Sequence, residues 1–455
     1  MTPDDLCLRA AHLRSQGQDD EAERLFHRAL LADPDHLNAL ANLRDIFAGQ
    51  RKFSAALAIA RRVVAAVPHD GVQWDRLASA YMLLDRFPEA RAATDRALEL
   101  APDNPLHWHQ SALLAHRLGD SETALAHARA ALELNPYGLD LLNDRAHMLM
   151  AAGGDLAAAL EAYEVRWATL AHLHPWDLHI PEWKGESLAG NRVLFHSEQG
   201  LGDAIMMARF ARDLVAAGAA QVGLCLPCEL TRLFQVQRWP GVKIVDLTVI
   251  DRDDWDLQTP MFSGFRWLGM TRGDIDGSPY LTNVPKVIVP ALPTGFRVGV
   301  CWASGRWNVD TGMRRMVPFS LILEELGSVP GVRLVSLQKG DDARDLETLG
   351  AVPLVANPMP ACDDFAATAA VVAQLDVVIT VDTAILHLAA AMGKPTFMLC
   401  QFTRCWRWWS LPNGAPWYQT MIAGQQSDPH DWRGPVYAAR DWVAARNEGG
   451  RDGDG

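Results

Sequence analysis

Prolines recur every 34 residues through the first third of the chain, at Pro34, Pro68, Pro102 and Pro136. They close similar stretches, which read HRALLADP, RRVVAAVP, DRALELAP and ARAALELNP. A period of this length indicates a repeat protein whose unit is a pair of helices, because a proline ends the second helix of each pair. One pair cannot bury its apolar face alone, so successive pairs must stack. The sequence therefore predicts an α-solenoid at the start of the chain.

The repeats resemble the tetratricopeptide (TPR) family. The third repeat fits best, with the expected residue types before its proline at Trp74, Leu77, Tyr81, Ala90 and Ala97. A fifth repeat begins near residue 139 and lacks the proline, as terminal repeats often do. We expect about five repeats over residues 1–172, with a concave groove that binds a peptide or protein. A spacer or a dimerisation arm is the alternative.

Composition limits the classes of partner. The chain has 455 residues, 49% of them hydrophobic and 21% charged, which fits a folded protein of two or three domains. Its net charge of −13 disfavours non-specific binding to nucleic acid or to an anionic membrane. The first residues, MTPDDLCLRA, do not read as a signal peptide, and no apolar run is long enough to span a membrane. We therefore expect a cytoplasmic protein with no membrane span and no nucleic-acid partner.

The cysteines give little evidence for a metal. There are seven, and only Cys225 and Cys228 form a CxxC pair. One such pair without a second pair or nearby histidines is weak evidence for zinc. We expect no metal site and mostly structural thiols.

A second architecture follows a Pro/Trp/Gly-rich linker at residues 173–190. Short apolar runs such as NRVLFHS, QVGLCLP, GFRVGVC, VRLVSL and DVVITV alternate with amphipathic stretches. Strands that alternate with helices indicate parallel sheets covered by helices. We expect two facing Rossmann-like domains, at 191–294 and 295–440, with a shared cleft at the carboxyl ends of their strands. Residues 441–455 are expected to form a flexible tail.

In the first of these domains, GLGD (200–203) lies between a strand and a helix. It lacks the third glycine of a dinucleotide fingerprint, so a nicotinamide site is not expected. The glycines allow close backbone approach and place the carboxylate of Asp203 at a helix start. The alternative is that Asp203 only caps the helix.

In the second domain, polar and basic residues follow successive strands: Ser304, Arg306, Arg315, Gln338, Lys339, Asp382 and Thr383. Basic side chains and a helix N-terminus at one sheet edge suit a diphosphate leaving group, because its negative charge grows as the bond to the sugar breaks. The alternative for each basic residue is a solvated surface charge. Trp406 and Trp408, in RCWRWW, either stack on a base or sugar ring or pack between the domains.

Several stretches together resemble the TPR-fused bacterial glycosyltransferases whose catalytic half is related to heptosyltransferases. They are HSEQGLGDAI, VGVCWASG, SLQKG, DFAATAAVVAQLDVVITVDTAILHLAAAMGKP, WRWW and WYQTM. The architecture is also similar to that of the O-linked N-acetylglucosamine transferases and of flagellin glycosyltransferases with a TPR arm. The resemblance implies a GT-B fold and an inverting, metal-independent transfer from a nucleotide-sugar, with no cofactor.

The resemblance also implies roles for particular residues. Asp203 matches the acidic residue proposed as general base, and Glu198 is the alternative. On the donor side, Asp382, Thr383 and His387 match a DT…H motif, and Gln338 and Lys339 match nucleotide contacts. Ala384 stands where heptosyltransferases usually have a glycine, next to the expected phosphate.

The function that follows from the resemblance is transfer of a sugar to a protein acceptor recruited by the TPR arm, with flagellin-like proteins as one example. In one alternative, the acceptor is a glycan or a lipid-linked precursor. In another, the chain is a TPR scaffold whose transferase half has lost activity.

Overall fold

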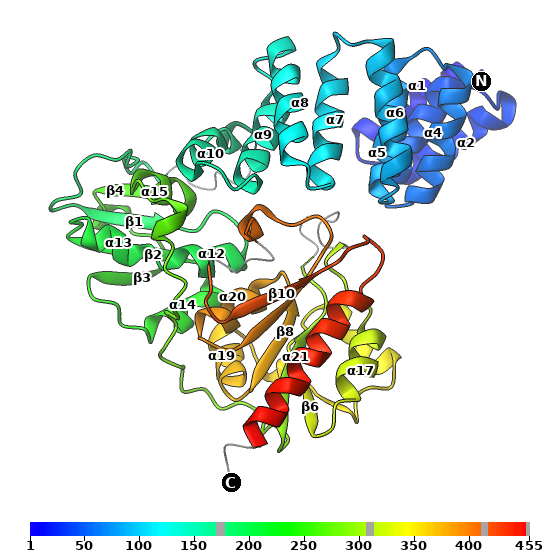
Figure 1. Cartoon of the computed structure of the whole chain (residues 1–455). Helices are drawn as coiled ribbons and strands as arrows, with labels where there is room; N and C mark the ends of the chain where they lie inside the picture. The colour runs from blue at the N-terminus through cyan, green and yellow to red at the C-terminus, as the bar shows by residue number, and fades with distance from the viewer. Residues whose placement is uncertain (170–177, 306–313, 411–416, 452–455) are drawn as a thin grey trace. The chain divides into compact units, whose positions relative to one another are not determined.

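The structure is a computed structural model that describes residues 1–169, 178–305, 314–410 and 417–451. The chain divides into two compact units, Met1–Met148 and Leu149–Gly455 (Figure 1). The first unit consists of helices that pair in chain order: α1 (Pro3–Ser15) with α2 (Asp19–Ala32), α3 (Leu37–Gly49) with α4 (Phe53–Ala66), α5 (Gly71–Leu83) with α6 (Phe87–Leu100), and α7 (Pro105–Arg117) with α8 (Ser121–Leu134). The predicted helical TPR solenoid is confirmed.

The 34-residue period has a direct structural cause. The second helix of each pair ends two residues before the repeat proline. Alanines at one repeat position are almost completely buried where helices cross: Ala22, Ala56, Ala90 and Ala124. The indole of Trp74 donates to the Pro68 carbonyl at 2.9 Å, and Trp108 donates to the Pro102 carbonyl at 2.8 Å. Each of these tryptophans thus fixes the turn that joins its repeat to the preceding one.

The second unit begins within helix α9 (Leu139–Ala151) and continues through α10 (Leu156–Tyr163) and α11 (Arg166–Thr169). Its first sheet contains β1 (Arg192–His196), β2 (Gln221–Leu226), β3 (Val242–Asp246) and β4 (Leu257–Pro260), in the order β3-β2-β1-β4. All neighbouring strands are parallel. The helices that connect them are α12 (Leu201–Ala208), α13 (Ala211–Ala216) and α14 (Cys228–Gln235), and α15 (Met261–Trp267) follows β4.

The second sheet has six parallel strands: β5 (Phe296–Cys301), β6 (Val332–Ser336), β7 (Val355–Ala356), β8 (Val377–Val381), β9 (Thr396–Cys400) and β10 (Met421–Gln425). Their order is β10-β9-β8-β5-β6-β7, so the strand order reverses between β5 and β8. Ligands of open α/β sheets bind beyond the carboxyl ends of the strands at such a reversal. The predicted parallel-sheet α/β region is confirmed. That it forms two facing Rossmann-like domains of a GT-B enzyme stays a prediction.

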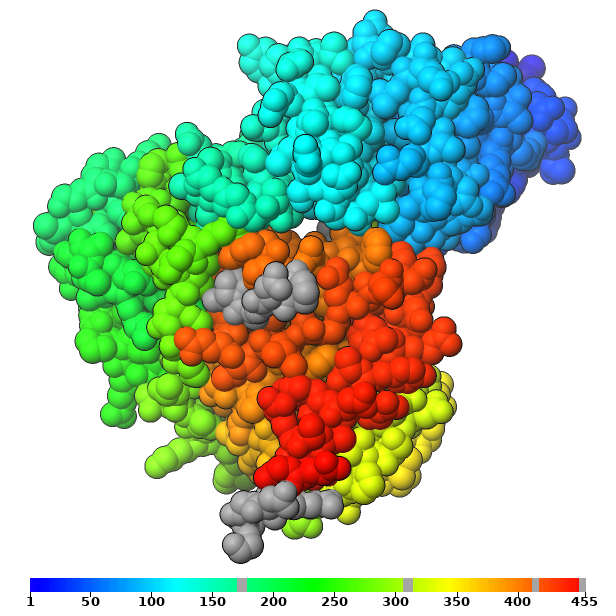
Figure 2. Space-filling model, viewed as in Figure 1, coloured from blue at the N-terminus to red at the C-terminus, as the bar shows by residue number. Residues whose placement is uncertain are grey.

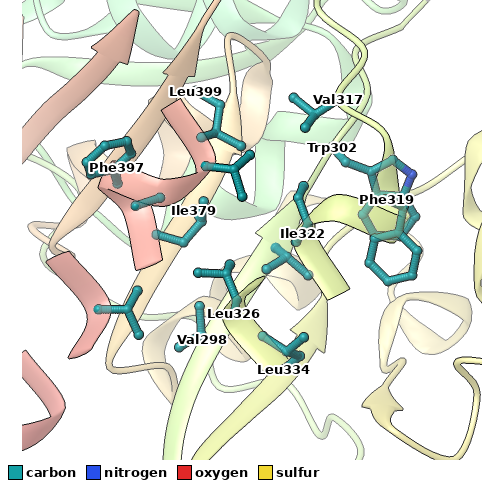
Figure 3. Close-up of a cluster of buried hydrophobic side chains, with 14 of the residues drawn as sticks. Val298, Trp302, Val317, Phe319, Ile322, Leu326, Leu334, Ile379, Phe397 and Leu399 are labelled. Atoms are coloured by element: carbon teal, nitrogen blue, oxygen red, sulfur yellow. The ribbon is translucent and has the colours of Figure 1, made fainter. Parts of the chain in front are cut away.

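A continuous apolar core holds the second sheet to its helices (Figure 3). Val298 and Ile379, on the adjacent strands β5 and β8, are buried together with Leu334 on β6. Trp302 stacks on Phe319 at the start of α17 (Phe319–Gly327), with ring centroids 4.0 Å apart. This packing fixes the backbone directly after β5, where the chain enters the crevice.

Two boundaries differ from those expected from the sequence. Residues 441–451 are not a flexible tail, because helix α21 (Arg433–Arg451) continues through them. Val443 is fully buried in the core of the second sheet, and Asn447 donates to the Pro330 carbonyl at 2.8 Å. The boundary between the compact units falls after Met148, whereas the solenoid was expected to reach residue 172. Helix α10 packs against α15 of the α/β region.

Within the described residues, no helix is both long and apolar enough to cross a membrane.

Candidate functional site

Two adjoining cavities lie at the reversal of strand order. The first, here called the strand-end pocket, has a volume of about 390 Å³ and is lined by residues that follow β5, β6 and β8, including Ala303, Lys339 and Thr383. The second, the Asp203 pocket, has a volume of about 300 Å³. Leu201 and Ala384 line both cavities, so both the first and the second sheet contribute to this site.

Asp382 and Thr383 connect β8 to helix α20 (Ala384–Ala391). The Thr383 hydroxyl accepts a hydrogen bond from the Ile385 amide at 3.2 Å and thereby caps the helix. Asp382 is buried and pairs with Arg315, whose Nη2 lies 3.0 Å from Oδ2. Burial alone would raise the pKa of Asp382, but Arg315, His387 and Arg407 hold it below its usual value. Asp382 is therefore an ionised group that orients Arg315.

His387 lies one turn into α20 and is 3% exposed. Its Nδ1 is 2.8 Å from the Tyr418 hydroxyl, and its Nε2 is 3.9 Å from Asp382 Oδ1. Burial lowers the pKa of His387 to about 4, against the opposing effect of Asp382 and Asp203. The imidazole is therefore neutral near pH 7.

Asp203 lies in the first turn of α12 but does not cap it, because Gly200 is the N-cap and no side chain bonds there. Its carboxylate instead pairs with Arg407, whose Nε donates to Oδ1 at 2.8 Å. Both residues line the Asp203 pocket. The alternative of a simple helix cap is therefore wrong for Asp203.

Gly202 explains how the two halves of the site approach each other. A Cβ atom at this position would lie 2.8 Å from Cδ2 of His387 and 3.5 Å from Cα of Ala384. Helices α12 and α20 pack directly against each other. The glycine thus permits close helix packing across the site.

Arg407 was not among the site residues predicted from the sequence, which from RCWRWW included only the tryptophans Trp406 and Trp408. Burial lowers the pKa of Arg407, but Asp203, Cys405 and Asp382 more than offset this and raise it. Trp408 is fully buried and stacks on His387, with centroids 5.7 Å apart. Trp406 is 8% exposed and packs edge-on against Phe262 at 5.9 Å. Of the two interpretations of these tryptophans, the structure supports packing and not stacking on a ligand.

The remaining predicted donor-side residues are divided between the two pockets. Gln338 is buried, and its Oε1 accepts from the amides of Trp302 at 3.1 Å and Ala303 at 2.9 Å, which ties the end of β6 to that of β5. Lys339 lines the strand-end pocket and donates to the Cys362 carbonyl. Ser304 lines the Asp203 pocket. Arg306 lies outside the described residues.

Glu198 is not brought to either pocket. Its side chain is 2% exposed and pairs with Arg166, whose Nε donates to Oε2 at 2.7 Å. Its Oε1 accepts from the Phe262 amide at 2.8 Å. The structure therefore separates Glu198 from Asp203, and only Asp203 reaches the cavity.

The two pockets combine a carboxylate with groups that suit an anion. Asp203 lines one pocket and can accept a proton from a hydroxyl group. Arg315 lines the same pocket, Lys339 lines the other, and the N-terminus of α20 lies at both, so these groups can stabilise an anion. Within the ranges that the structure describes, no cluster of three or more His, Cys, Asp or Glu residues could hold a metal ion.

Models of known protein families match three parts of the chain. A model of glycosyltransferase family 9 (heptosyltransferase) matches residues 361–415, which include Asp382, Thr383 and His387. Tetratricopeptide repeat models match residues 73–104 and 108–137.

Individual proteins are similar over longer stretches. Protein FlbA of Caulobacter vibrioides is 28% identical over 431 residues, an alignment that covers 88% of this chain and 71% of FlbA. The general transcriptional corepressor trfA of Dictyostelium discoideum is 25% identical over 126 residues, which cover 27% of this chain and 9% of trfA.

Similar solved structures include a thermophilic TPR protein of Thermus thermophilus, with 22% identity and a TM-score of 0.33 over 39% of this chain and 94% of that one. A MamA structure from Desulfovibrio magneticus has 24% identity and a TM-score of 0.28 over 30% of this chain and 77% of that one. The repeats, the family 9 match and the likeness to FlbA together support a TPR-fused glycosyltransferase.

Proposed function

We propose that this chain transfers a sugar from a nucleotide-sugar donor to a hydroxyl group of a protein acceptor recruited by the TPR repeats. The observation that carries the proposal is the arrangement of the Asp203 pocket. Asp203, from α12, lines one cavity together with Arg315 and with Thr383 and Ala384 at the start of α20. A proton acceptor and an anion-stabilising group in one cavity are what a direct displacement at a sugar carbon requires.

In this proposal the strand-end pocket holds the nucleotide. Leu337 and Phe365 give it apolar walls, and Lys339 supplies a positive charge. The N-terminus of α20, with Thr383 and Ala384, lies where the two pockets join, and the helix dipole would favour a diphosphate there. Gln338 accepts hydrogen bonds from the amides of Trp302 and Ala303 and so fixes the backbone after β5, where Ala303 lines the strand-end pocket. No metal or cofactor is assigned a role.

Arg315 is suited to the leaving group. Asp382 holds it by its side-chain oxygen and by its carbonyl oxygen, each at 3.0 Å. Its Nε is buried and has no hydrogen-bond partner among the described residues. A guanidinium fixed in this way stabilises a developing negative charge without the cost of reorganisation at the moment of reaction.

Asp203 is proposed as the general base. Its carboxylate is held by the salt bridge to Arg407, and a carboxylate is able only to accept. The acceptor hydroxyl would bond to Asp203 and lose its proton to it as the oxygen attacks the sugar carbon. In such a direct displacement the nucleoside diphosphate would leave from the face opposite the attack, stabilised by Arg315, and the reaction would invert the configuration at that carbon.

The protein acceptor is assigned to the solenoid. Polar residues spaced by 34 occupy equivalent positions on its first helices: Asn42, Arg76, Gln110 and Asp144. Asn42 accepts from Arg14 at 2.8 Å, and Asp144 pairs with His109 at 2.8 Å. In this proposal these chemically mixed groups line the acceptor groove, and a flagellin-like protein is a proposed acceptor by analogy alone.

A donor screen followed by transfer tests the proposal. A cognate nucleotide-sugar among UDP-, GDP-, CMP- and ADP-linked sugars should raise Tm by mass action. The same donor should then label a protein acceptor and release the nucleoside phosphate. Transfer to a glycan but to no protein would refute the assigned acceptor. No Tm shift and no transfer with any donor would refute the enzyme itself.

A further inference from the structure

The end of the helical arm, residues 150–169, contacts segments that adjoin the candidate site. Arg166, at the start of α11, has a side chain that is 2% exposed. Its Nε and Nη2 donate to the two carboxylate oxygens of Glu198 at 2.7 and 3.2 Å, and Nη2 also donates to the Ser263 hydroxyl at 2.8 Å. Its Nη1 donates to Glu164 at 3.1 Å. Arg166 therefore joins the arm end to the first sheet through a buried polar network.

This network acts on the loop that leads to Asp203. Glu198 and Gln199 lie between β1 and α12, and Asp203 is in the first turn of that helix. Gln199 donates to the hydroxyl of Tyr163, also in the arm end, at 2.5 Å. Two consecutive residues of the loop are thus held by the arm end, only a few residues before Asp203.

The arm end also contacts the segment that carries Arg407, the partner of Asp203. Arg272 donates to the carbonyls of Met150 at 2.7 Å and Gly154 at 3.0 Å, and its guanidinium lies 3.9 Å from the ring of Trp409. A Cβ atom added at Gly153 of the arm end would lie 3.3 Å from Cδ1 of Trp409, which is two residues from Arg407. In Figure 2 the teal-green residues near 160 lie against the green residues of the first sheet region, where α10 packs against α15. The arm end thus contacts both segments that carry the Asp203–Arg407 ion pair.

Stability alone is a weak explanation for the buried Arg166–Glu198 pair. A buried ion pair often stabilises no more than a well-packed apolar pair of the same size, because both charges lose their hydration. Burial raises the pKa of Glu198, and Arg166 opposes that effect. What a bidentate arginine–carboxylate contact does provide is a fixed geometry.

We infer that Arg166 is a positioning residue, which holds the 197–200 loop so that Asp203 faces the cavity. This inference rests on the proposed function, in which Asp203 is the general base. The arm end therefore has a role in turnover that is separate from acceptor recruitment by the repeats.

Full-length variants test this. Arg166→Met should lower kcat about ten- to a hundredfold while the donor KM changes less than about threefold, because a shift near 1 Å of a catalytic group costs on this order. Arg166→Lys, which keeps the charge, should recover part of the loss. Glu161→Gln is the matched control, because it removes an exposed ion pair between α10 and α15 that does not reach the loop. If Arg166→Met does not fold, Arg166→Met/Glu198→Gln removes the unpaired charge and takes its place.

A double-mutant cycle separates positioning from a structural role. Because Arg166 acts through Asp203, Arg166→Met should change kcat less than about threefold in an Asp203→Asn background. An equal loss in both backgrounds, an unchanged kcat, or a raised KM alone would overturn the inference.

Hydrogen exchange gives a readout that needs no turnover. Arg166→Met should speed exchange at the amides of residues 199–208 and leave residues 384–391 unchanged. If the wild-type chain transfers no sugar from any donor, the proposed function fails, and exchange alone still decides whether Arg166 holds the loop. Unchanged exchange at 199–208 would overturn the inference.

Discussion

Gly202→Ala probes the closest approach in the site. The added Cβ would lie 2.8 Å from Cδ2 of His387, about 0.7 Å inside the roughly 3.5 Å at which carbon atoms attract best. His387 cannot move aside easily, because it is bonded to Tyr418 and stacked on Trp408. Helices α12 and α20 must therefore separate. Overpacking of this kind costs about 1–3 kcal/mol, so Tm should fall by several degrees.

The separation should also reduce turnover. Asp203 is the next residue, and a displacement of several tenths of an ångström from its position should lower kcat about tenfold. Gly327→Ala, at the exposed last residue of α17, is the matched control for stability, because no atom lies within 4 Å of an added Cβ. Thermal unfolding and initial rates of both variants measure the difference. Equal Tm values for the two variants would refute the reasoning, as would an undiminished cost of Gly202→Ala in a His387→Ala background.

Other expectations concern single groups. Asp203→Asn should lower kcat roughly 10²–10⁴-fold, the usual contribution of a general base, with donor affinity by calorimetry little changed; near-normal kcat would exclude Asp203 as the base. Lys339→Ala should weaken nucleotide binding by calorimetry more than Lys243→Ala, an exposed control on β3, and equal affinities would remove Lys339 from the site. Because burial lowers the folded-state pKa of His387 from 6.5 to about 4, the unfolded chain binds the proton more tightly. The contribution of neutral His387 to the free energy of unfolding is therefore fully present above pH 6.5 and is lost as pH falls toward 4. In the His387→Gln variant, Tm should fall less between pH 7 and pH 4 than in the wild-type chain. An unchanged dependence of Tm on pH would contradict this.

The sequence predicted the solenoid well because its determinants are local. The prolines, the small residues at helix crossings and the Trp74–Pro68 contact all lie within one repeat period. The α/β region was also predictable, since strands and helices alternate along the chain. The helical residues 441–451 were missed, because their order depends on packing of Val443 into the core of the second sheet.

The site was predicted in part, and the division has a physical reason. Residues that follow strands, such as Asp382 and Lys339, could be placed because carboxyl ends of parallel strands meet at one edge. The residues that pair with the site residues and orient them could not be placed from the sequence. Arg407 pairs with a residue 204 positions away, and Arg166 pairs with one 32 positions away, and no spacing rule connects such pairs. The tryptophans of RCWRWW were ambiguous, since sequence does not distinguish an aromatic ring that binds a ligand from one that packs inside.

The arm end also determines where the catalytic part of the chain begins. A chain that starts at residue 175 keeps both sheets but lacks Tyr163 and Arg166, which leaves the Glu198 carboxylate buried without its partner. Breaking a buried pair in this way costs about 3–5 kcal/mol. A chain that starts at Leu139, the first residue of α9, keeps the whole network.

We therefore expect the chain from Leu139 to unfold at a higher Tm than the chain from residue 175 and to bind donor nucleotide as the full chain does. It should glycosylate a small hydroxyl compound at the full rate but a protein acceptor far more slowly, because the groove that positions the protein is gone. Thermal unfolding, calorimetry and initial rates with both acceptors measure this. If the two truncated chains have the same Tm and the same rate with the small acceptor, the arm end has no role in the site. If the chain from Leu139 modifies the protein acceptor at the full rate, the repeats do not recruit it.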